Sequence, residues 1–349
     1  MTSAKPFDSL FKFSGANGKW PHSSLVALNG TLYGTTSSGG LGLGNVFAIT
    51  PQGHETSLHS FVGGNDGNDP ESSLTVLGDT LYGTTTAGGS SNYGTIFSIT
   101  PTGIEKVIYS FKGGSDGGEP QAQLLAFQGK LYGVSTVGGI SNGGTAFSVT
   151  TSGVERVLHR FGSPRDGSGP VGRLTAVNGV LYGATVTDGT RHTGTVYQLT
   201  LNGAEKKLFE FDGTNGYYPS SGLTYYNGGL FGLTQQGGAH GGGVVFRITP
   251  SGSERTIYSF DGSDGGGGGG NLTLVGHVLY GATTNGGSAE EGVLFSITPD
   301  GTERVLHSFN GPDEGNPSGS FPYFDGKLYG TTLGGGGLSD DGTVFSFTI

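Results

Sequence analysis

Apolar and polar residues alternate in short runs along the whole chain. In residues 72–77, 94–100 and 58–61, and in the run around Leu81, the side chains follow one another with the period of two that is typical of β-strands. Dipeptides such as Asn29-Gly30 separate the first run from the second, and Pro-x-Gly segments separate the third from the fourth. No window has the 3.6-residue period of a helix. The pattern therefore predicts an all-β protein of short antiparallel strands and tight turns.

One unit of four such runs occurs seven times. The tripeptide Leu-Tyr-Gly recurs at intervals of 49 or 50 residues, starting at Leu32, Leu81, Leu131, Leu181, Leu279 and Leu328, with Leu230-Phe231-Gly232 in the remaining unit. Four strands per unit, apolar on both faces, are typical of blades packed between neighbours. We therefore predict a single seven-bladed β-propeller domain of four-stranded antiparallel blades over residues 1–349.

The two ends of the chain predict how the ring closes. Residues 10–13 match the fourth run of a unit, whereas the chain ends inside a third run. We expect the N-terminal strand to complete the last blade and remove an exposed edge. The expected blade repeats are about 17–61, 66–111, 116–161, 166–211, 215–260, 264–309, and 313–349 plus 8–13. The two-residue turns between first and second runs are expected to be type I′.

Composition and charge narrow the range of partners. The chain has 73 Gly in 349 residues, no Cys, and 17 Lys and Arg against 27 Asp and Glu, for a net charge of −10. Without a basic cluster, we expect no nucleic-acid partner and no attraction to anionic membranes. No apolar run is long enough for membrane insertion. We expect a monomer without a cofactor or a metal site.

The repeat motif resembles a known bacterial family. Asp66-Gly67, Pro70, residues 81–85, Gly88-Gly89 and residues 94–111 look like the tandem repeat called GloVer, and the motif recurs around the chain. The resemblance implies a propeller with the strand order of NHL-type propellers, in which the run before Leu-Tyr-Gly is innermost. It also implies a secreted or cell-surface bacterial protein, although this chain begins without a hydrophobic leader. It carries over no catalytic residues.

Candidate binding residues come from positions that differ between otherwise similar repeats. The long links between runs fall at one end of the blades, where binding residues usually concentrate. Around the start of the first run the variable residues supply flat aromatic surfaces and hydrogen-bonding groups, as in sugar-binding sites. We predict that a glycan or a protein partner is bound there, by Trp20, Asp69, Glu119, Gln123, Arg173, Tyr217 and Tyr218.

Two other functions remain open. A propeller lyase or hydrolase could act on an acidic or polar carbohydrate-like substrate by acid/base chemistry, with His22, Glu71 and Arg173 as catalytic residues. His192 or His240 could complete such a set. No nucleophile elbow, metal-ligand spacing or phosphate loop supports an enzyme. The third alternative is a purely structural repeat module.

Positions that recur in every repeat are interpreted as structural. We expect the Tyr of Leu-Tyr-Gly to lie in the blade core, and the Glu after each Pro-x-Gly turn, such as Glu105, to be a solvated edge charge. An Asp or Asn precedes every first run, from Asn17 to Asp313; it could form a Ca²⁺-binding ring or, as we favour, an Asx turn. The histidines at 59, 159 and 307 alternate with Tyr and Phe at one position and are interpreted as structural.

Overall fold

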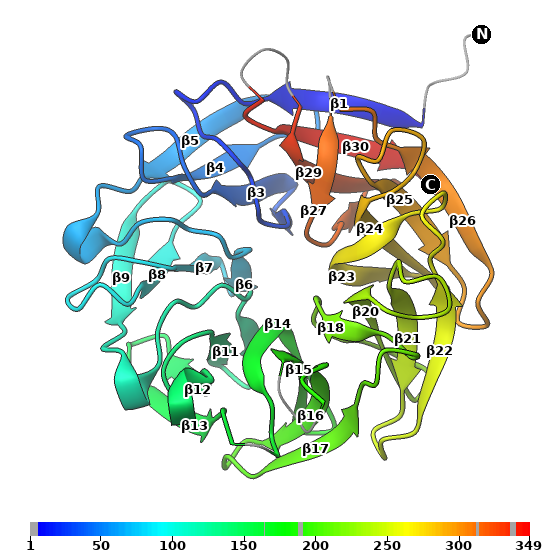
Figure 1. The fold of residues 1–349 in the computed structure, drawn as a ribbon. Coiled ribbons are helices and arrows are strands. Elements are labelled where there is room, and N and C mark those ends of the chain that lie inside the picture. Colours follow the sequence, from blue (N-terminus) through cyan, green and yellow to red (C-terminus); the bar gives the residue numbers. More distant parts are fainter. Residues whose placement is uncertain (1–5, 164, 188–190, 312–313, 336–339) are drawn as a thin grey trace, which may run out of the picture.

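The computed structural model describes residues 6–163, 165–187, 191–311, 314–335 and 340–349. These residues form seven antiparallel sheets arranged around a central opening (Figure 1). In each sheet the strands follow one another from the channel outward in chain order, except that β1 is the outermost strand of the last sheet, so the run before Leu-Tyr-Gly is innermost. The predicted seven-bladed propeller is confirmed.

The blades have nearly the same strand boundaries. Blade 1 comprises β2 (Val26–Leu28), β3 (Thr31–Thr36), β4 (Asn45–Ile49) and β5 (Glu55–Ser60). Blade 2 comprises β6 (Thr75–Leu77), β7 (Thr80–Thr85), β8 (Thr95–Ile99) and β9 (Glu105–Ser110). Blade 3 comprises β10 (Leu125–Phe127), β11 (Lys130–Ser135), β12 (Thr145–Thr150) and β13 (Glu155–Arg160). Blade 4 comprises β14 (Ser168–Val177), β15 (Val180–Thr187), β16 (Thr195–Thr200) and β17 (Glu205–Glu210).

The remaining blades differ mainly in their inner strand. Blade 5 comprises β18 (Tyr217–Pro219), β19 (Thr224–Tyr226), β20 (Gly229–Gln236), β21 (Val244–Ile248) and β22 (Glu254–Ser259). Blade 6 comprises β23 (Gly266–Val275), β24 (Val278–Asn285), β25 (Val293–Ile297) and β26 (Glu303–Ser308). Blade 7 comprises β27 (Gly315–Ser318), β28 (Tyr323–Phe324), β29 (Lys327–Gly334), β30 (Thr343–Thr348) and the N-terminal β1 (Phe7–Lys12). Three 3₁₀ turns lie in the links: η1 (Gly64–Asp66), η2 (Gly114–Asp116) and η3 (Ile140–Asn142). No helix in the described ranges is long and apolar enough to cross a membrane.

Strand β1 closes the ring. It pairs antiparallel with β30, with Phe7 opposite Phe347 and Lys12 opposite Thr343. The first and last strands of the chain therefore belong to one sheet, as Figure 1 shows in blue and red. The predicted closure is confirmed.

The hairpin turns follow two geometries rather than one. In blade 1 both central residues, Asn29 and Gly30, have positive φ, as the predicted type I′ turn requires. In blades 2 and 6 only the first central residue, Gly78 or Gly276, has positive φ, which is the type II′ pattern. The prediction of type I′ throughout was wrong for these two blades, because a Gly at the first central position takes the positive φ alone.

The core consists of seven layers between neighbouring blades. At each interface a buried Phe after the outer strand packs its ring against a ring of the next blade; Phe61 and Phe97 are 5.2 Å apart and meet edge to face. Such pairs add to the free energy of apolar burial. The Gly of Leu-Tyr-Gly makes room for this ring, since a Cβ on Gly83 would lie 2.5 Å from Phe97. The adjacent Tyr82 is 7% exposed, and the tyrosines of the repeat are core residues as predicted.

A second type of contact joins neighbouring blades near their outer strands. It consists of the residue at the position of His59, the Asp or Asn of the link that follows, and the Glu of the next blade, and we call each such group an outer cluster. In one outer cluster, one side-chain N or O atom from each of His59, Asp66 and Glu105 lies within 4.8 Å of the other two. His59 Nε2 is 3.2 Å from Asp66 Oδ1, and the backbone N–H of Val62 donates to Oδ2. The histidine is thus a structural residue, as predicted. The favoured Asx-turn interpretation was wrong for Asp66, because its carboxylate accepts from the backbone N–H four residues earlier, whereas an Asx turn bonds the backbone two residues further on. Asp313 lies outside the described residues.

The Glu of the outer cluster is not a solvated edge charge, so that expectation was wrong. Glu105 is half-buried, and its Oε1 is buried. Burial, together with the charge of Asp66, raises the pKa of Glu105 to about 7. Burial and a neighbouring Asp likewise raise the pKa of Glu155, Glu205 and Glu303 to about 7. The sequence interpretation failed because the turn that carries this Glu packs against the neighbouring blade: a Cβ on Gly103 would lie 2.8 Å from the Leu58 carbonyl oxygen.

Candidate ligand-binding site at the channel mouth

All long links lie on one face of the ring, and the inner strands begin there. On that face, which Figure 1 shows toward the viewer, the residue immediately before the Pro of each repeat, or before Gly268 in blade 6, has positive φ. These residues are Trp20, Asp69, Glu119, Gly169, Tyr218, Gly267 and Asn316. The sequence alone shows only that this position varies, because backbone conformation cannot be read from it.

The backbone at this position favours Gly or Asn. A residue with a Cβ in the left-handed region is less stable by roughly 1–2 kcal/mol, and bulky residues are rarely found there. Gly169, Gly267 and Asn316 satisfy the preference, whereas Trp20, Glu119 and Tyr218 do not. Strained backbone of this kind concentrates at functional sites.

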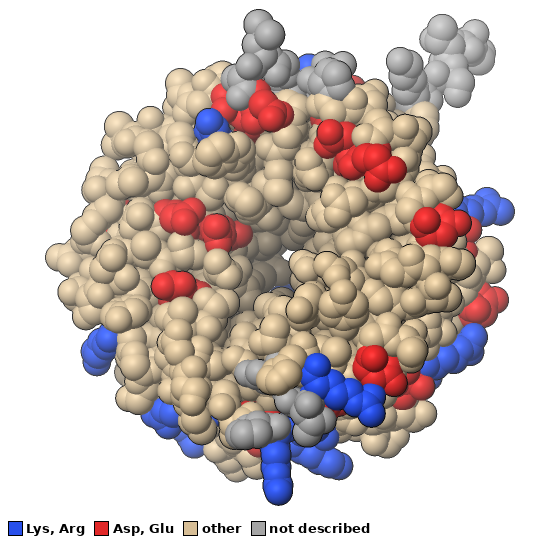
Figure 2. All heavy atoms as spheres, viewed as in Figure 1, with Lys and Arg blue, Asp and Glu red and all other residues tan. Residues whose placement is uncertain are grey.

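A cavity of about 340 Å³, which we call the central cavity, opens at the mouth of the channel. Figure 2 shows the opening at the centre of this face. Four predicted residues line it together: His22, Glu71, Gln123 and Arg173. Blades 1 to 4 each supply one of them, at the start of their inner strands. The volume lies in the range of ligand pockets.

Hydrogen bonds between neighbouring inner strands hold the wall of this cavity. The backbone N–H of Ser24 donates to Ser73 Oγ over 2.8 Å, and Gln123 Nε2 donates to the Leu74 carbonyl over 2.8 Å. On the opposite side the N–H of Gly222 donates to Asn271 Oδ1. The wall is therefore fixed before any ligand arrives.

Arg173 occupies the same ring position but makes no such bond. Its guanidinium has no hydrogen-bond or ion-pair partner among the residues that the structure describes. The side chain is exposed to the channel, yet burial within the channel walls lowers its pKa. Gln123, Arg173 and Asn271 also line a second cavity of about 460 Å³ deeper in the channel. A cation without a partner thus stands where the two cavities meet.

The two other titratable groups in the central cavity have shifted pKa values. Burial raises the pKa of Glu71, the charges of Asp69 and Glu119 raise it further, and a hydrogen bond from Gln121 Nε2 over 2.9 Å opposes them. Burial lowers the pKa of His22, which Asp69 partly offsets. Both shifts favour the uncharged forms of these side chains.

A third cavity of about 420 Å³ lies between blades 1 and 2 on the same face, and we call it the blade 1–2 cavity. Trp20, Asp69, His22 and Glu71 line it. His22 and Glu71 therefore face both this cavity and the central one. Two more predicted ligand residues, Trp20 and Asp69, are placed beside the site.

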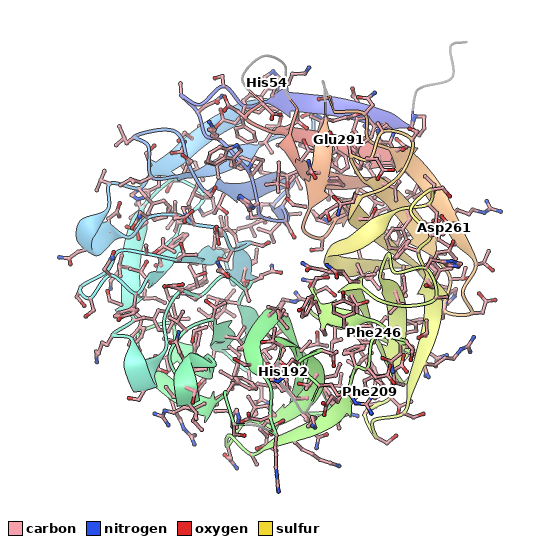
Figure 3. All side chains as sticks on the ribbon, in the orientation of Figure 1. His54, His192, Phe209, Phe246, Asp261 and Glu291 are labelled. Atoms are coloured by element: carbon pink, nitrogen blue, oxygen red, sulfur yellow. The ribbon has the colours of Figure 1, made fainter. Side chains whose placement is uncertain are left out.

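The remaining predicted residues lie elsewhere. Glu119, Tyr217 and Tyr218 do not line the central cavity or the blade 1–2 cavity. Tyr217 and Tyr218 pack edge to face on blade 5, and Tyr217 donates a hydrogen bond to Gln236. His192, labelled in Figure 3, lies over blade 4 and is not part of either lining.

Several residues of the site were not among the predicted set. Gln121 and Asn271 line the central cavity, from blades 3 and 6. Both belong to the variable positions around the first run. They differ from the other residues at these positions in that their side chains point into the cavity, which the sequence does not show. Backbone atoms of Gly268, Gly269 and Gly270 complete the wall beside Asn271.

The structure does not assemble an acid/base pair. His22, Glu71 and Arg173 share the central cavity, but no hydrogen bond joins any two of them in the described part of the chain. Glu71 bonds Gln121 instead. The arrangement can hold a polar ligand with few conformational changes, whereas proton transfer needs a donor and an acceptor within reach of a substrate.

Comparison with known proteins places the chain in a family. Residues 1–147 and 126–345 match the model of the Gloeobacter/Verrucomicrobia repeat. The chain belongs to this repeat family. The match covers nearly all blades of the ring, so the Gloeobacter/Verrucomicrobia repeat accounts for the domain and not for one segment of it. No curated protein sequence matches the chain.

Solved structures with a similar fold include three bacterial proteins. A putative 6-phosphogluconolactonase from Bacteroides uniformis is 13% identical, with a TM-score of 0.52, covering 82% of this chain and 84% of that chain. A puromycin-hydrolyzing peptidase from Mycobacterium tuberculosis is 11% identical, with a TM-score of 0.55, covering 94% of this chain and 52% of that chain. A gluconolactonase from Xanthomonas campestris is 13% identical, with a TM-score of 0.48, covering 77% of this chain and 82% of that chain. At these identities the likeness of the Gloeobacter/Verrucomicrobia repeat protein to the first two structures concerns the fold alone.

Proposed function

We propose that this propeller binds an acidic glycan at the mouth of its channel. The observation that carries the proposal is the guanidinium of Arg173, which faces the central cavity without a partner in the described residues. Arg forms strong, often bidentate hydrogen bonds with carboxylates, and these strengthen where water is partly excluded. A ligand carboxylate would supply the partner that Arg173 lacks among the described residues.

The other groups of the cavity suit sugar hydroxyls. Gln121, Gln123 and Asn271 supply amide groups, Ser24 and Ser73 supply hydroxyls, and Glu71 supplies acceptor oxygens. A small number of fixed polar groups in a concave site is the usual basis of ligand specificity. An extracellular or cell-surface location, which we also propose, would bring this face into contact with glycans.

Binding to uronic-acid glycans, measured by an array and then by calorimetry, tests this function. We expect Arg173→Ala to weaken binding by about 10- to 100-fold, since a hydrogen bond to a charged group contributes about 1.5–3 kcal/mol. Arg173→Lys should recover only part of it, because Lys lacks the planar fork. Arg255→Ala, on the outer strand β22, is the matched control. Binding that survives Arg173→Ala unchanged would refute the proposal, and a protein ligand with the same Arg173 dependence would replace the glycan.

A second candidate is acid/base catalysis on an acidic sugar. It is favoured by the opposite pKa shifts of His22 and Glu71 in one cavity, because an uncharged imidazole can accept a proton that a protonated carboxyl can donate. Turnover of uronic-acid glycans that Glu71→Gln abolishes, without loss of binding, would favour the enzyme. Binding without turnover across the panel would favour the receptor.

A further inference from the structure

We propose that the ligand is an extended oligosaccharide with a defined direction. Its acidic unit lies on Arg173 in the central cavity, and a neutral sugar further along stacks on Trp20 in the blade 1–2 cavity. This inference rests on the proposed function and adds the length and the polarity of the glycan.

The two cavities adjoin each other. His22 and Glu71 contribute to the walls of both, so the proposed ligand runs past these two side chains from the central cavity into the blade 1–2 cavity. The volumes, about 340 and 420 Å³, are each in the range of ligand pockets. A single sugar in the central cavity would leave the blade 1–2 cavity filled with water.

Trp20 is held as a platform. The backbone N–H of Trp20 donates to the backbone carbonyl of Asp341 over 2.9 Å, and the backbone carbonyl of Trp20 accepts from the backbone N–H groups of His22 and Ser37. The ammonium of Lys19 lies 4.2 Å from the centre of the indole ring and is 3.4 Å from Asp341 Oδ1. Despite these contacts the side chain is 43% exposed. A fixed, accessible indole presents the flat apolar surface on which a sugar ring packs.

The backbone does not require an aromatic residue at this position. The equivalent residues in blades 4 and 6, Gly169 and Gly267, adopt the same positive φ without strain. Trp20 is therefore the unfavourable choice for the turn and the favourable one for a ligand. Stability and binding can be separated at this residue.

The charges give the ligand its direction. At the inner end, Arg173 lines the central cavity, and at the outer end Asp69 lines the blade 1–2 cavity, where the Lys19 ammonium beside Trp20 is already paired with Asp341. Thr86 Oγ1 donates to one Asp69 oxygen, Oδ2, and Gln121 donates to one Glu71 oxygen, Oε2. The other oxygen of each carboxyl group can accept a hydrogen bond from a sugar hydroxyl, and the charge of Asp69 repels a second acidic unit at the outer end. A carboxylate is therefore favoured at the inner end only.

Calorimetry with matched sugars tests this inference. The panel consists of a uronic acid alone, oligosaccharides with that acid at one end or at both ends, and neutral oligosaccharides of equal length, each based on glucuronic, galacturonic and mannuronic acid. We expect the singly acidic oligosaccharide to bind at least 10-fold more tightly than the monosaccharide. The doubly acidic and the neutral oligosaccharides should both bind more weakly than the singly acidic one.

The decisive variant is Trp20→Gly, with Glu119→Gly at the equivalent position of blade 3 as its control. Trp20→Gly should abolish the gain from chain length while leaving monosaccharide affinity unchanged and without lowering the melting temperature, because Gly is unstrained in this conformation. Equal affinities for monosaccharide and oligosaccharide, or a gain that survives Trp20→Gly, would overturn this inference and leave the proposed function intact. If no acidic sugar binds, or if Arg173→Gln has no effect, the proposed function fails, and this inference fails with it.

Discussion

One backbone position, immediately before the Pro of the repeat, restricts which residues are stable there. The positive φ there is shared by all seven blades, although the residues range from Gly to Trp. Where Gly169 stands, a Cβ would meet its nearest neighbour, Val186, only at 3.9 Å. The restriction at this position is therefore one of backbone conformation and not of space.

Gly169→Ala measures that restriction directly. We expect the free energy of unfolding to fall by about 1 kcal/mol or more, because Ala in the left-handed region is strained while there is room for its side chain. Urea denaturation at fixed pH gives the value. Glu119→Ala, which keeps a Cβ in the same conformation, should change stability by less than about 0.5 kcal/mol. Equal losses in both variants would show that the turn is not strained.

At this scale the sequence gives the candidates but not their directions. The variable positions around the first run include Arg173, Gln123, His22 and Glu71, which meet in one cavity, and Tyr217 and Tyr218, which do not. Chain spacing places all of them at the channel mouth. Which side chain turns toward the channel depends on the local break of each inner strand, such as the separate β18 and β19 of blade 5 against the continuous β14 of blade 4.

Between outer strands, the side-chain pairs of the outer clusters follow a chemical rule. His59, His159 and Tyr109 can donate a hydrogen bond, and each pairs with an Asp. Phe209 cannot donate, and its repeat has Asn215, whose Oδ1 accepts from the backbone N–H of Asp212. A carboxylate is present where a donor is present.

The rule predicts a rescue. His159→Phe removes the donor 2.9 Å from Asp166 Oδ2, and Asp166 is only 6% exposed. We expect a loss of about 1–3 kcal/mol, the penalty for a buried polar group without its partner. Adding Asp166→Asn reproduces the pair at 209 and 215 and should recover part of the loss. A double-mutant cycle by urea denaturation gives the coupling, and additive losses would contradict the rule.

The Glu residues of the outer clusters predict a pH dependence. The pKa of Glu105, Glu155, Glu205 and Glu303 is about 7 in the folded chain, above the ordinary 4.5. The folded state thus binds more protons than the unfolded state between these values. Their contribution to stability is complete below about pH 4.5 and is lost as pH rises through 7.

Replacing these four Glu by Gln should reduce the decrease of the melting temperature between pH 5 and pH 8. The variant should gain most at pH 8, where the buried Glu side chains are charged and Gln is not. Thermal unfolding at several pH values measures the change. Glu290→Gln, at an exposed position, is the control and should leave the profile as it is. An unchanged slope in the fourfold variant would show that these carboxyl groups ionise normally.

Repeat spacing could not reveal the outer clusters. Glu105 follows a polar turn signal and carries a charge, which in one blade considered alone is typical of a solvated edge. Its environment comes from the preceding blade, through Asp66. The period, the turn residues and the repeat length predicted the strands and turns within each blade. Contacts between blades depend on the twist and tilt of the sheets, which these patterns do not show.

For the whole molecule, closure depends on strand β1. Phe7 stacks on His307 with ring centres 4.0 Å apart, and Phe13 is 1% exposed in the core between blades 7 and 1. Sequence alone predicted this closure, because residues 10–13 repeat a fourth run and the chain ends after a third. Figure 3 shows how the side chains fill the blades and leave the centre open.

Removal of residues 1–13 tests the closure. The edge of β30 then loses its partner, so we expect a lower melting temperature and aggregation through the open edge. A synthetic peptide of residues 6–15 should bind the truncated protein and restore its melting temperature, whereas a scrambled peptide should not. Scanning calorimetry and light scattering measure both effects. Normal stability without the peptide would show that β1 is dispensable.

The spacing within the outer cluster bears on how such a ring can arise. His59 and Asp66 are seven residues apart, and so are His159 and Asp166. A gene duplication that copies any one repeat without splitting this short stretch carries donor and acceptor together. Each new blade would thus bring its own matched pair into the ring. Crossovers between repeats are tolerated at the hairpin turns, but within the link between blades they would join a Phe to an Asp and leave a carboxylate without its donor.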